Sequence, residues 1–523
     1  MDAIKADAIV VGAGLNGSWV AKELTSGGMK VVLIDAGPIL PASTFKIDHQ
    51  ADVFNPFYHL FRLKLLLKGD TDNAFNKFIT AQTSKLFLDR RREPYITPPG
   101  RDFAWLRVRA VGGRGHLWGR VMLRVTDQQL SRPGFEWPLR YADLAPFYRE
   151  IERLLELGGA ASKLSDVPDG DYVHERALHP LEQRFCTSVA RRWPLRRATV
   201  NHVAQYEPAP LSPMLKAAHE TGRLRLFPDK TAVVLTTEGA NKIAGVVTVC
   251  AKSRRVETFR APVVVLAASA FESVRILLNS RSETFPNGVG NSNGLLGTRI
   301  LEHMMVNFFG QLPASIRAKK PTYGHNPFKL NAEPHGFYMP PFSHRENPQR
   351  DYRFSYGVQG VISTDTGLVY LGAFGETVPY DSNRLRLDAN RKDRFGMPLA
   401  SIDFSWSPED LAMWKDADSA LSEMLEAFSC DCGIKLERPT TSKVYDMFTN
   451  NRLPIPGSNH ECGGARMGRD PASSVVDPFN RLWEAPNVLV CDSACFPSIP
   501  YQNPTLTSMA LAVRASRQLL AEA

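Results

Sequence analysis

A glycine-rich turn near the N-terminus constrains the fold of this chain more than any other feature. Residues 7–11 (DAIVV) are apolar and rich in β-branched side chains, which predicts a buried parallel strand. The strand leads into residues 12–17 (GAGLNG), a G-x-G-x-x-G pattern, and then into residues with helical spacing that end at Gly27-Gly28. A second apolar run, residues 31–34, ends on Asp35. This order predicts a Rossmann-like nucleotide-binding unit.

Each residue type in the pattern has a physical task. Gly12 permits a tight turn, Gly14 lets the main chain approach a pyrophosphate, and Gly17 lets helix and strand pack closely. We expect the pyrophosphate on the free N–H groups at the positive end of the helix, beside Leu15 and Asn16. Asp35 is placed to accept hydrogen bonds from adenosine ribose hydroxyls, and its charge disfavours NADP. The motif alone leaves NAD and FAD as alternatives.

A second glycine-rich segment covers residues 108–124 (VRAVGGRGHLWGRVMLR). Its glycines leave the backbone open around a histidine and a tryptophan, so a flat, bulky ligand can lie close to the main chain. The residues expected at such a ligand are Gly112, Gly113, Gly115, His116, Leu117 and Trp118. Downstream, Asp143 is expected to cap the N-terminus of a helix whose apolar stripe begins at Leu144.

Composition and charge exclude several classes of protein. The net charge of +9 arises from 63 basic and 54 acidic residues, and the one dense basic run, residues 90–92, is too short for a nucleic-acid surface. The longest uncharged apolar stretch, residues 261–271, is far below the ~20 residues of a membrane helix. Seven cysteines without regular spacing indicate reduced thiols, no metal site and a cytoplasmic protein.

The C-terminal segment decides the class. Residues 459–523 contain, in order, HECGGARMG, SVVDPFNRLW, NVLVCDSACFP and NPTLTSMALA. Together with GAGLNG, the VGGRGHLWGR loop and the stretch GVGNSNGLLGTRILEH at 288–303, these motifs resemble the glucose–methanol–choline (GMC) oxidoreductases. The V-G-G loop with its tryptophan is nearer to the pyranose- and glycoside-oxidising members. The segments 41–95 and 305–450 match the family little.

The resemblance implies an FAD enzyme in which His460 takes the proton of an alcohol while hydride moves to flavin N5. Asn503 corresponds to the family's His or Asn partner of that base. The resemblance also implies FAD contacts from Val233, Asp492, Ser493, Asn503, Pro504 and Thr505. Pyranose oxidases attach FAD through the histidine immediately before the tryptophan. Leu117 occupies that position and His116 precedes it, so we expect non-covalent FAD.

The chemistry of the two side chains supports these roles independently of the family. A neutral imidazole titrates near neutrality and can act as a general base, with an advantage of ~10²–10⁴-fold. A carboxamide such as Asn503 can bond the same substrate oxygen without competing for the proton. His303, in LEHMM, is expected to have a structural role instead.

The expected fold class is α/β (α+β overall), with a Rossmann-like FAD-binding domain on a parallel sheet and a substrate domain on a mostly antiparallel sheet with helices. Predicted strands include 231–237, 242–249 and 263–266, and a helix is predicted over 409–428. The expected domains are FAD-binding, 1–40, 100–165, 200–304 and 456–523; substrate-binding, 305–455; a helical cover, 41–99; and a connecting segment, 166–199.

The expected function is oxidation of an alcohol to the carbonyl, with a hydroxyl of a sugar, glycoside, aminoglycoside or polyol as substrate. The electron acceptor is O₂ or another molecule. Alternatives are oxidation of a sterol, aryl or choline-like alcohol, a flavin-containing lyase, a nicotinamide-dependent dehydrogenase, and a nucleotide-binding module without catalysis.

Overall fold

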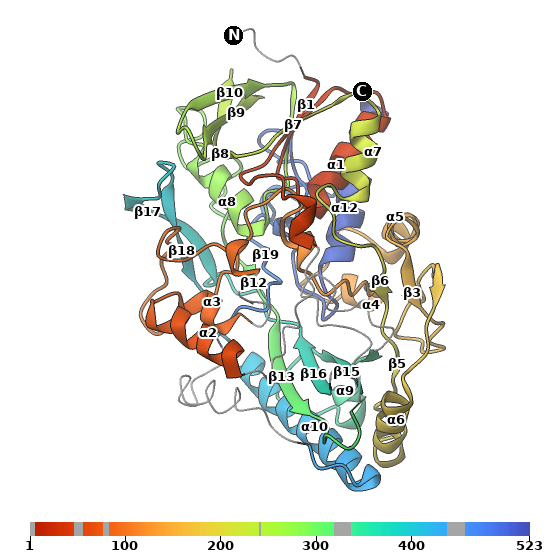
Figure 1. The fold of residues 1–523 in the computed structure, drawn as a ribbon. Coiled ribbons are helices and arrows are strands. Elements are labelled where there is room, and N and C mark those ends of the chain that lie inside the picture. Colours follow the sequence, from red (N-terminus) through yellow and green to blue (C-terminus); the bar gives the residue numbers. More distant parts are fainter. Residues whose placement is uncertain are drawn as a thin grey trace.

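The computed structural model describes residues 6–45, 56–76, 83–239, 242–317, 336–365, 367–436 and 455–523. One half of the molecule, the part around β1 and β7 in Figure 1, is built on a five-stranded, fully parallel sheet in the order β20-β11-β1-β2-β7. Its strands come from both ends of the chain. The strand β1, near the start of the chain, pairs with β11, and β11 pairs with β20, near the end. The strands of this sheet are β1 (Ala8–Val11), β2 (Val31–Ile34), β7 (Leu224–Phe227), β11 (Val263–Leu266) and β20 (Val488–Val490).

Helices on the parallel sheet bury its apolar strands. The helix α1 packs between α12 and α7, and the three lie side by side in Figure 1. The helices of this half are α1 (Leu15–Ser26), α5 (Tyr141–Leu154), α7 (Pro213–Glu220), α8 (Ala270–Asn279) and α12 (Thr505–Glu522). An antiparallel sheet adjoins them, made of β8 (Lys230–Glu238), β9 (Lys242–Cys250) and β10 (Val256–Arg260).

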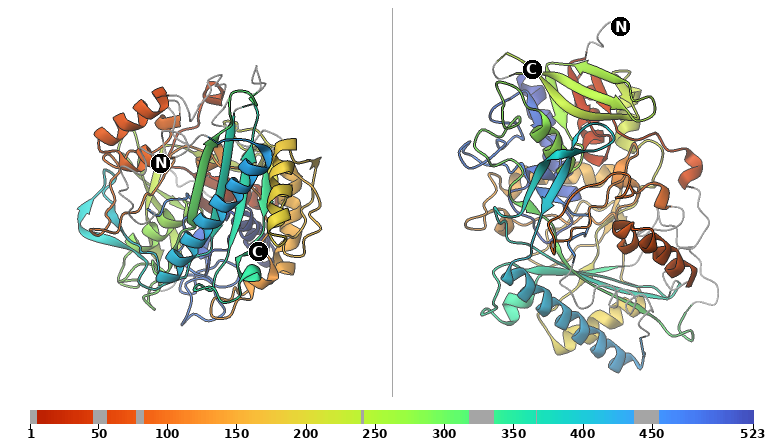
Figure 2. Two further views of the ribbon diagram at one scale, coloured as in Figure 1. Left: turned by 90° about the horizontal axis from the view of Figure 1, so that it is seen from below. Right: turned by 90° about the vertical axis from the view of Figure 1, so that its left-hand side faces the viewer.

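The other half is built on an antiparallel sheet in the order β13-β16-β15-β14-β5. The long helix α10 crosses the outer face of this sheet (Figure 2, left), and its buried side chains join the sheet in a second hydrophobic core. The elements are β5 (Thr199–Val200), β13 (Met304–Gln311), β14 (Phe337–Met339), β15 (Tyr356–Ile362), β16 (Leu368–Gly375), α6 (Pro180–Arg192) and α10 (Pro408–Cys432).

Several further elements complete the fold. The remaining strands are β3 (Leu157–Gly159), β4 (His174–Glu175), β6 (Val203–Ala204), β12 (Ile300–Leu301), β17 (Arg384–Lys392), β18 (Pro398–Asp403) and β19 (Cys462–Gly463). The short helices are α2 (Pro56–Leu67), α3 (Thr71–Phe75), α4 (Asp127–Leu130) and α9 (Ser343–Glu346). In the described part of the chain, no helix combines the length and the apolar character needed to span a membrane.

The expected fold class is confirmed, and three details differ from expectation. The helix α5 begins at Tyr141, so Asp143 is its third residue, and its carboxylate accepts the Arg140 N–H at 2.7 Å, which is one half of a capping box. The segment expected to connect the halves, 166–199, contributes α6, whose Phe185 and Val189 are fully buried in the second core. The strand β5, near position 200, extends the antiparallel sheet.

The cover segment forms the two predicted helical stretches, α2 and α3, with the break near Gly69. Phe61 and Leu65 pack on a small core, whereas Leu60 and Leu67 are exposed. Residues 77–79 of this stretch and several residues of the range 305–455 lie outside the described residues.

Candidate active site

A long cavity runs between the parallel sheet and the catalytic residues expected from the C-terminal motifs. Residues of the first glycine turn and Asp35 line one part of it, and His460 and Asn503 line another. Two helix N-termini meet at this cavity, those of α1 and α12. Neither helix has a side chain capping its N-terminus or an acidic residue in its first turn. Their N–H groups are therefore oriented for an anionic ligand.

The glycines of the first turn have separate structural tasks. A Cβ atom on Gly17 would lie 1.8 Å from the carbonyl oxygen of Gly12, so α1 reaches β1 closely only with glycine here. A Cβ on Gly14 would meet nothing within 4 Å, because this position faces the open cavity. Gly12 adopts φ +101°, a conformation that favours glycine. The turn thus leaves main-chain atoms uncovered beside α1.

Asp35 holds the glycine turn against the second strand. One carboxylate oxygen accepts the Ala13 N–H and the other accepts the Gly37 N–H, both at 2.8 Å. Burial raises the pKa of Asp35 to about 6. Asp35 lines the cavity, where its remaining lone pairs are available to a polar ligand.

Four of the six residues expected at a ligand from the second glycine segment line the cavity. Gly113, Gly115, Leu117 and Trp118 line the cavity. Gly112 and His116 do not; a Cβ on Gly112 would collide with the His116 ring, and His116 Nε2 lies 2.7 Å from the carbonyl oxygen of Val111. The imidazole is buried and is bonded within its own loop.

Val233 also lies outside the cavity lining. Its carbonyl oxygen accepts the side-chain N–H of Asn279 at 2.7 Å, whereas its neighbours Thr231 and Ala232 line the cavity. The strand β8 therefore reaches the cavity at Thr231 and Ala232, one or two residues before Val233.

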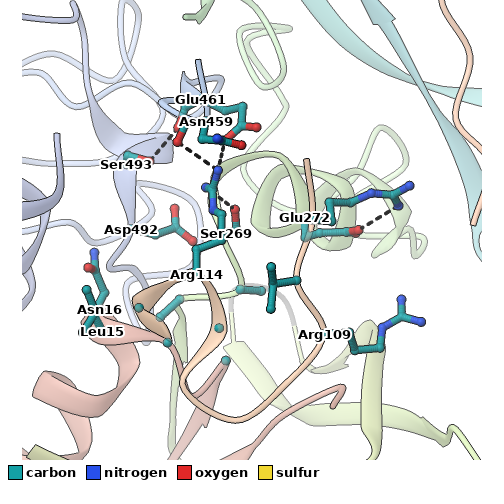
Figure 3. A pocket seen from close by; sticks show the side chains of 18 of the residues that line it. Leu15, Asn16, Arg109, Arg114, Ser269, Glu272, Asn459, Glu461, Asp492 and Ser493 are labelled. Atoms are coloured by element: carbon teal, nitrogen blue, oxygen red, sulfur yellow. Dashed lines mark hydrogen bonds and ion pairs between the residues drawn. The ribbon is translucent and has the colours of Figure 1, made fainter. Parts of the chain in front are cut away.

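An arginine of the glycine segment connects three chain segments at the cavity (Figure 3). Arg114 forms an ion pair with Glu461, donates to the carbonyl oxygen of Asn459 at 2.9 Å and donates to Ser269 Oγ at 3.2 Å. Ser269 and Asn459 both have positive φ, +81° and +68°. This cluster fixes the turn that precedes His460.

Asp492 follows β20 and points into the same cavity. Its carboxylate accepts the Ser273 hydroxyl at 2.5 Å and the Ala494 N–H at 3.0 Å. Burial raises the pKa of Asp492 to about 6. Ser493 beside it donates to the carbonyl oxygen of Glu461 at 2.8 Å, so the Asp492 turn and the His460 turn are linked.

The structure brings His460 and Asn503 together across 43 positions of sequence. Asn503 Nδ2 lies 3.3 Å from His460 Nε2. Gln359, from β15 of the antiparallel sheet, donates through Nε2 to Asn503 Oδ1 at 2.7 Å, which turns the amino group of Asn503 toward the imidazole. Phe374 packs on His460, with ring centroids 5.8 Å apart.

His303 and Glu302 lie directly behind His460. His303 Nδ1 is 2.7 Å from His460 Nδ1, and Glu302 Oε1 accepts the backbone N–H groups of His303 and His460 at 3.0 and 3.2 Å. Burial lowers the pKa of His303 to about 4. Burial and the nearby Glu461 carboxylate raise the pKa of Glu302.

Five residues of this site were not predicted as functional: Arg114, Glu302, His303, Gln359 and Glu461. Arg114 stands inside a glycine loop that the sequence singled out, so its position was a usable signal. Gln359 lies in a strand without any distinguishing pattern. His303 was expected to be structural, and its contact with His460 depends on pairing between distant segments.

The cavity fits a dinucleotide with a pyrophosphate. The space beside Gly14 leaves room for the pyrophosphate, and the two uncapped helix N-termini supply N–H donors for it. The buried carboxylates of Asp35 and Asp492 supply acceptors. The Ser508 hydroxyl donates to Asn16 Oδ1 at 3.2 Å, which ties the start of α12 to the start of α1.

Comparison with known proteins agrees with this architecture. A family model described as GMC oxidoreductase matches residues 379–512. The chain is 23% identical to a 2-methyl-1,2-propanediol dehydrogenase of Mycolicibacterium austroafricanum, over 97% of this chain and 94% of that protein. It is 25% identical to a paromamine 6'-oxidase of Streptomyces fradiae, over 98% and 90%. A formate oxidase of Aspergillus oryzae, solved in work on its FAD modification, superposes with a TM-score of 0.66 at 15% identity, over 99% of this chain and 98% of that one.

Proposed function

We propose that the chain is a glucose–methanol–choline oxidoreductase that uses FAD to oxidise a hydroxyl group of a sugar, glycoside, aminoglycoside or polyol. The observation that carries the proposal is one cavity with a pyrophosphate cradle at the α1 turn and the His460–Asn503 pair beside the start of α12. Bound FAD supplies the two-electron acceptor for the hydride of the carbinol carbon.

The residues of this chain perform the proton chemistry. His460 Nε2 takes the hydroxyl proton, and the amino group of Asn503, fixed by Gln359, donates a hydrogen bond to the substrate oxygen. The N-terminus of α12, beginning at Thr505, stabilises negative charge in the cavity by up to ~1–2 kcal/mol. Gly14, Leu15, Asn16, Asp35, Asp492 and Ser493 are the residues that would hold the dinucleotide.

Non-covalent attachment of FAD is part of the proposal. The only histidine of the second glycine segment, His116, is buried, bonded to Val111 and outside the cavity lining. The carbohydrate-like substrate class is supported by relatives named for a diol and for paromamine. A cytoplasmic location is also proposed, since all seven cysteines are free thiols.

Replacement of the base tests the proposal directly. We expect His460→Ala to slow anaerobic flavin reduction by at least ~10²-fold, because general-base catalysis contributes that much, while FAD stays bound. Stopped-flow absorbance at the flavin bands measures both. The matched control is His219→Ala, which removes an exposed histidine of α7. Wild-type reduction by His460→Ala would remove His460 from the mechanism.

The substrate class requires a screen. Sugars, glycosides, aminoglycosides and polyols are mixed anaerobically with the holoenzyme, beside sterol, aryl and choline-like alcohols, and flavin bleaching is recorded. We expect bleaching by a member of the first group. Bleaching confined to the second group would replace the proposed substrate class, and absence of flavin from the purified protein would contradict the FAD assignment. Admission of air then shows whether O₂ reoxidises the flavin.

A further inference from the structure

His303 and His460 face each other because of a short antiparallel pairing. The strand β12 pairs with β19, with Ile300 opposite Gly463 and Leu301 opposite Cys462. Continuing that register by two residues places His303 opposite His460. Opposed residues of an antiparallel pair have side chains about 4.5–5.5 Å apart at Cβ. Side chains at such opposed positions can touch. The imidazole rings of His303 and His460 do so, with ring centroids 4.9 Å apart and ring planes nearly perpendicular at 88°.

The proton positions of this pair follow from the outer partner of His303. Its Nε2 lies 2.6 Å from the carbonyl oxygen of Pro500, and a carbonyl oxygen can only accept. His303 Nε2 must therefore carry a proton. Burial lowers the pKa of His303 to about 4, so the ring is neutral near pH 7 and its Nδ1 presents a lone pair.

The proton of the neighbouring His460 ring lies on Nδ1. His303 Nδ1 and His460 Nδ1 are 2.7 Å apart, so one nitrogen must donate to the other. Since His303 Nδ1 can only accept, His460 Nδ1 carries the proton. In the other arrangement two lone pairs would face each other at that distance. A neutral His460 with its proton on Nδ1 has an unprotonated Nε2, which accepts from the amino group of Asn503.

We propose that His303 is a positioning residue that holds His460 in the tautomer whose Nε2 is unprotonated, the form able to accept the substrate's proton. Hydrogen bonds run in one direction, from Asn503 to His460, from His460 to His303, and from His303 to the Pro500 carbonyl. Pro500 and Asn503 lie three residues apart, so one short segment holds both ends of this relay. The inference rests on the proposed role of His460 as the base.

Glu302 gives the relay a fixed frame. One carboxyl oxygen of Glu302 accepts the backbone N–H groups of His303 and His460 and also the Ser458 hydroxyl. The two backbones therefore cannot separate without breaking these bonds. The remaining freedom of His460 is rotation and tautomerisation of its ring, which His303 restrains.

Two substitutions separate acceptance of the proton from simple packing. His303→Asn places an amide oxygen near the position of Nδ1 and can still accept from His460, whereas His303→Leu removes the acceptor and keeps bulk. We expect His303→Leu to lower the anaerobic flavin-reduction rate constant about 10-fold with little change in substrate Kd. We expect His303→Asn to recover a rate within about threefold of wild type. A free ring still visits the productive tautomer, so the loss should be smaller than for His460→Ala.

A readout independent of activity is nitrogen NMR of protein labelled with ring-¹⁵N histidine. We expect the His460 signals, identified by their loss in His460→Ala, to show a protonated Nδ1 and an unprotonated Nε2 in the wild type and a tautomer mixture in His303→Leu. The control is His202→Leu, which removes another fully buried histidine, bonded to Tyr172, and should change neither readout.

The outcomes are distinct. A wild-type rate and an unchanged His460 tautomer in His303→Leu would overturn the relay while leaving His460 as base. A protonated Nε2 on His460 in the wild type would overturn it as well. Wild-type reduction in His460→Ala would refute the proposed base, and the NMR result would then still decide whether His303 sets the tautomer.

Discussion

At the scale of single residues, Glu302 is unusual because its carboxyl is fully buried beside another carboxylate. One oxygen accepts backbone N–H groups from both site histidines, whereas Glu302 Oε2 is buried and has no hydrogen-bond partner among the described residues. Burial and the Glu461 carboxylate both disfavour its ionised form and raise its pKa.

A pH dependence of stability follows. Because the folded pKa of Glu302 is raised, the folded state binds the proton more tightly, and stability falls as pH rises above about 4.3, the pKa of a solvated glutamate. Glu302→Gln stays neutral at every pH, so we expect its stability to fall less than that of the wild type as pH rises. Its Tm relative to wild type should therefore increase steadily from pH 5 to pH 8 in differential scanning calorimetry.

The control is Glu238→Gln, at an exposed position in β8. Its Tm difference from wild type should stay constant over the same range. A constant difference for Glu302→Gln would show that Glu302 titrates normally in the folded protein.

At the scale of elements, the start of α1 determines whether the dinucleotide cradle exists. Gly17 and Gly14 are both glycines of one turn, but they face different surroundings. Gly17 faces the Gly12 carbonyl and Gly14 faces the cavity. One glycine therefore serves packing and the other serves the approach of a ligand to the main chain.

Alanine at each position separates these tasks. We expect Gly17→Ala to lower the Tm of FAD-free protein and to prevent FAD binding, since its Cβ would fall 1.8 Å from a backbone oxygen and α1 would have to move. We expect Gly14→Ala to keep the FAD-free Tm, because its Cβ meets nothing, and to weaken FAD binding at least ~10-fold by obstructing the pyrophosphate. Thermal melts and FAD titration by fluorescence measure both. Equal Tm losses in the two variants would contradict the distinction.

At the scale of the whole molecule, the cavity joins segments from both ends of the chain. The turn after β1, the strand β8, and the segment from His460 to α12 all line it. A ligand that binds there contacts elements that are distant in sequence, so its binding energy adds to folding stability. At a free ligand concentration of 100 times Kd the added stability is ≈2.7 kcal/mol.

Removal and return of FAD should show this linkage. We expect acid precipitation to release the flavin into the supernatant, because no covalent bond is proposed, and FAD-free protein prepared by mild dialysis to melt several degrees below holoenzyme. The Tm should rise with added FAD until the site is saturated. Flavin retained in the precipitate would overturn non-covalent attachment, and a Tm independent of FAD would overturn the cavity assignment.

Elements whose causes are local could be predicted from the sequence alone. The strand, glycine turn and helix of residues 8–26, the β8–β9 pair and the helix α12 depend on side-chain periodicity and turn residues within a few positions. His460 was identified from its motif for the same reason. Asp143 shows the limit of local reasoning, since a carboxylate at a helix start suits both the capping position and the third helical residue.

The surroundings of His460, the proposed base, depend on tertiary contacts. His303 reaches His460 through the register of β12 and β19, and Gln359 reaches Asn503 from a sheet in the other half of the molecule. His116, in contrast, turns into its own loop and away from the cavity. These contacts depend on the pairing and packing of segments more than 140 positions apart, or on a ring rotation set by burial. Periodicity along the chain carries no information about either.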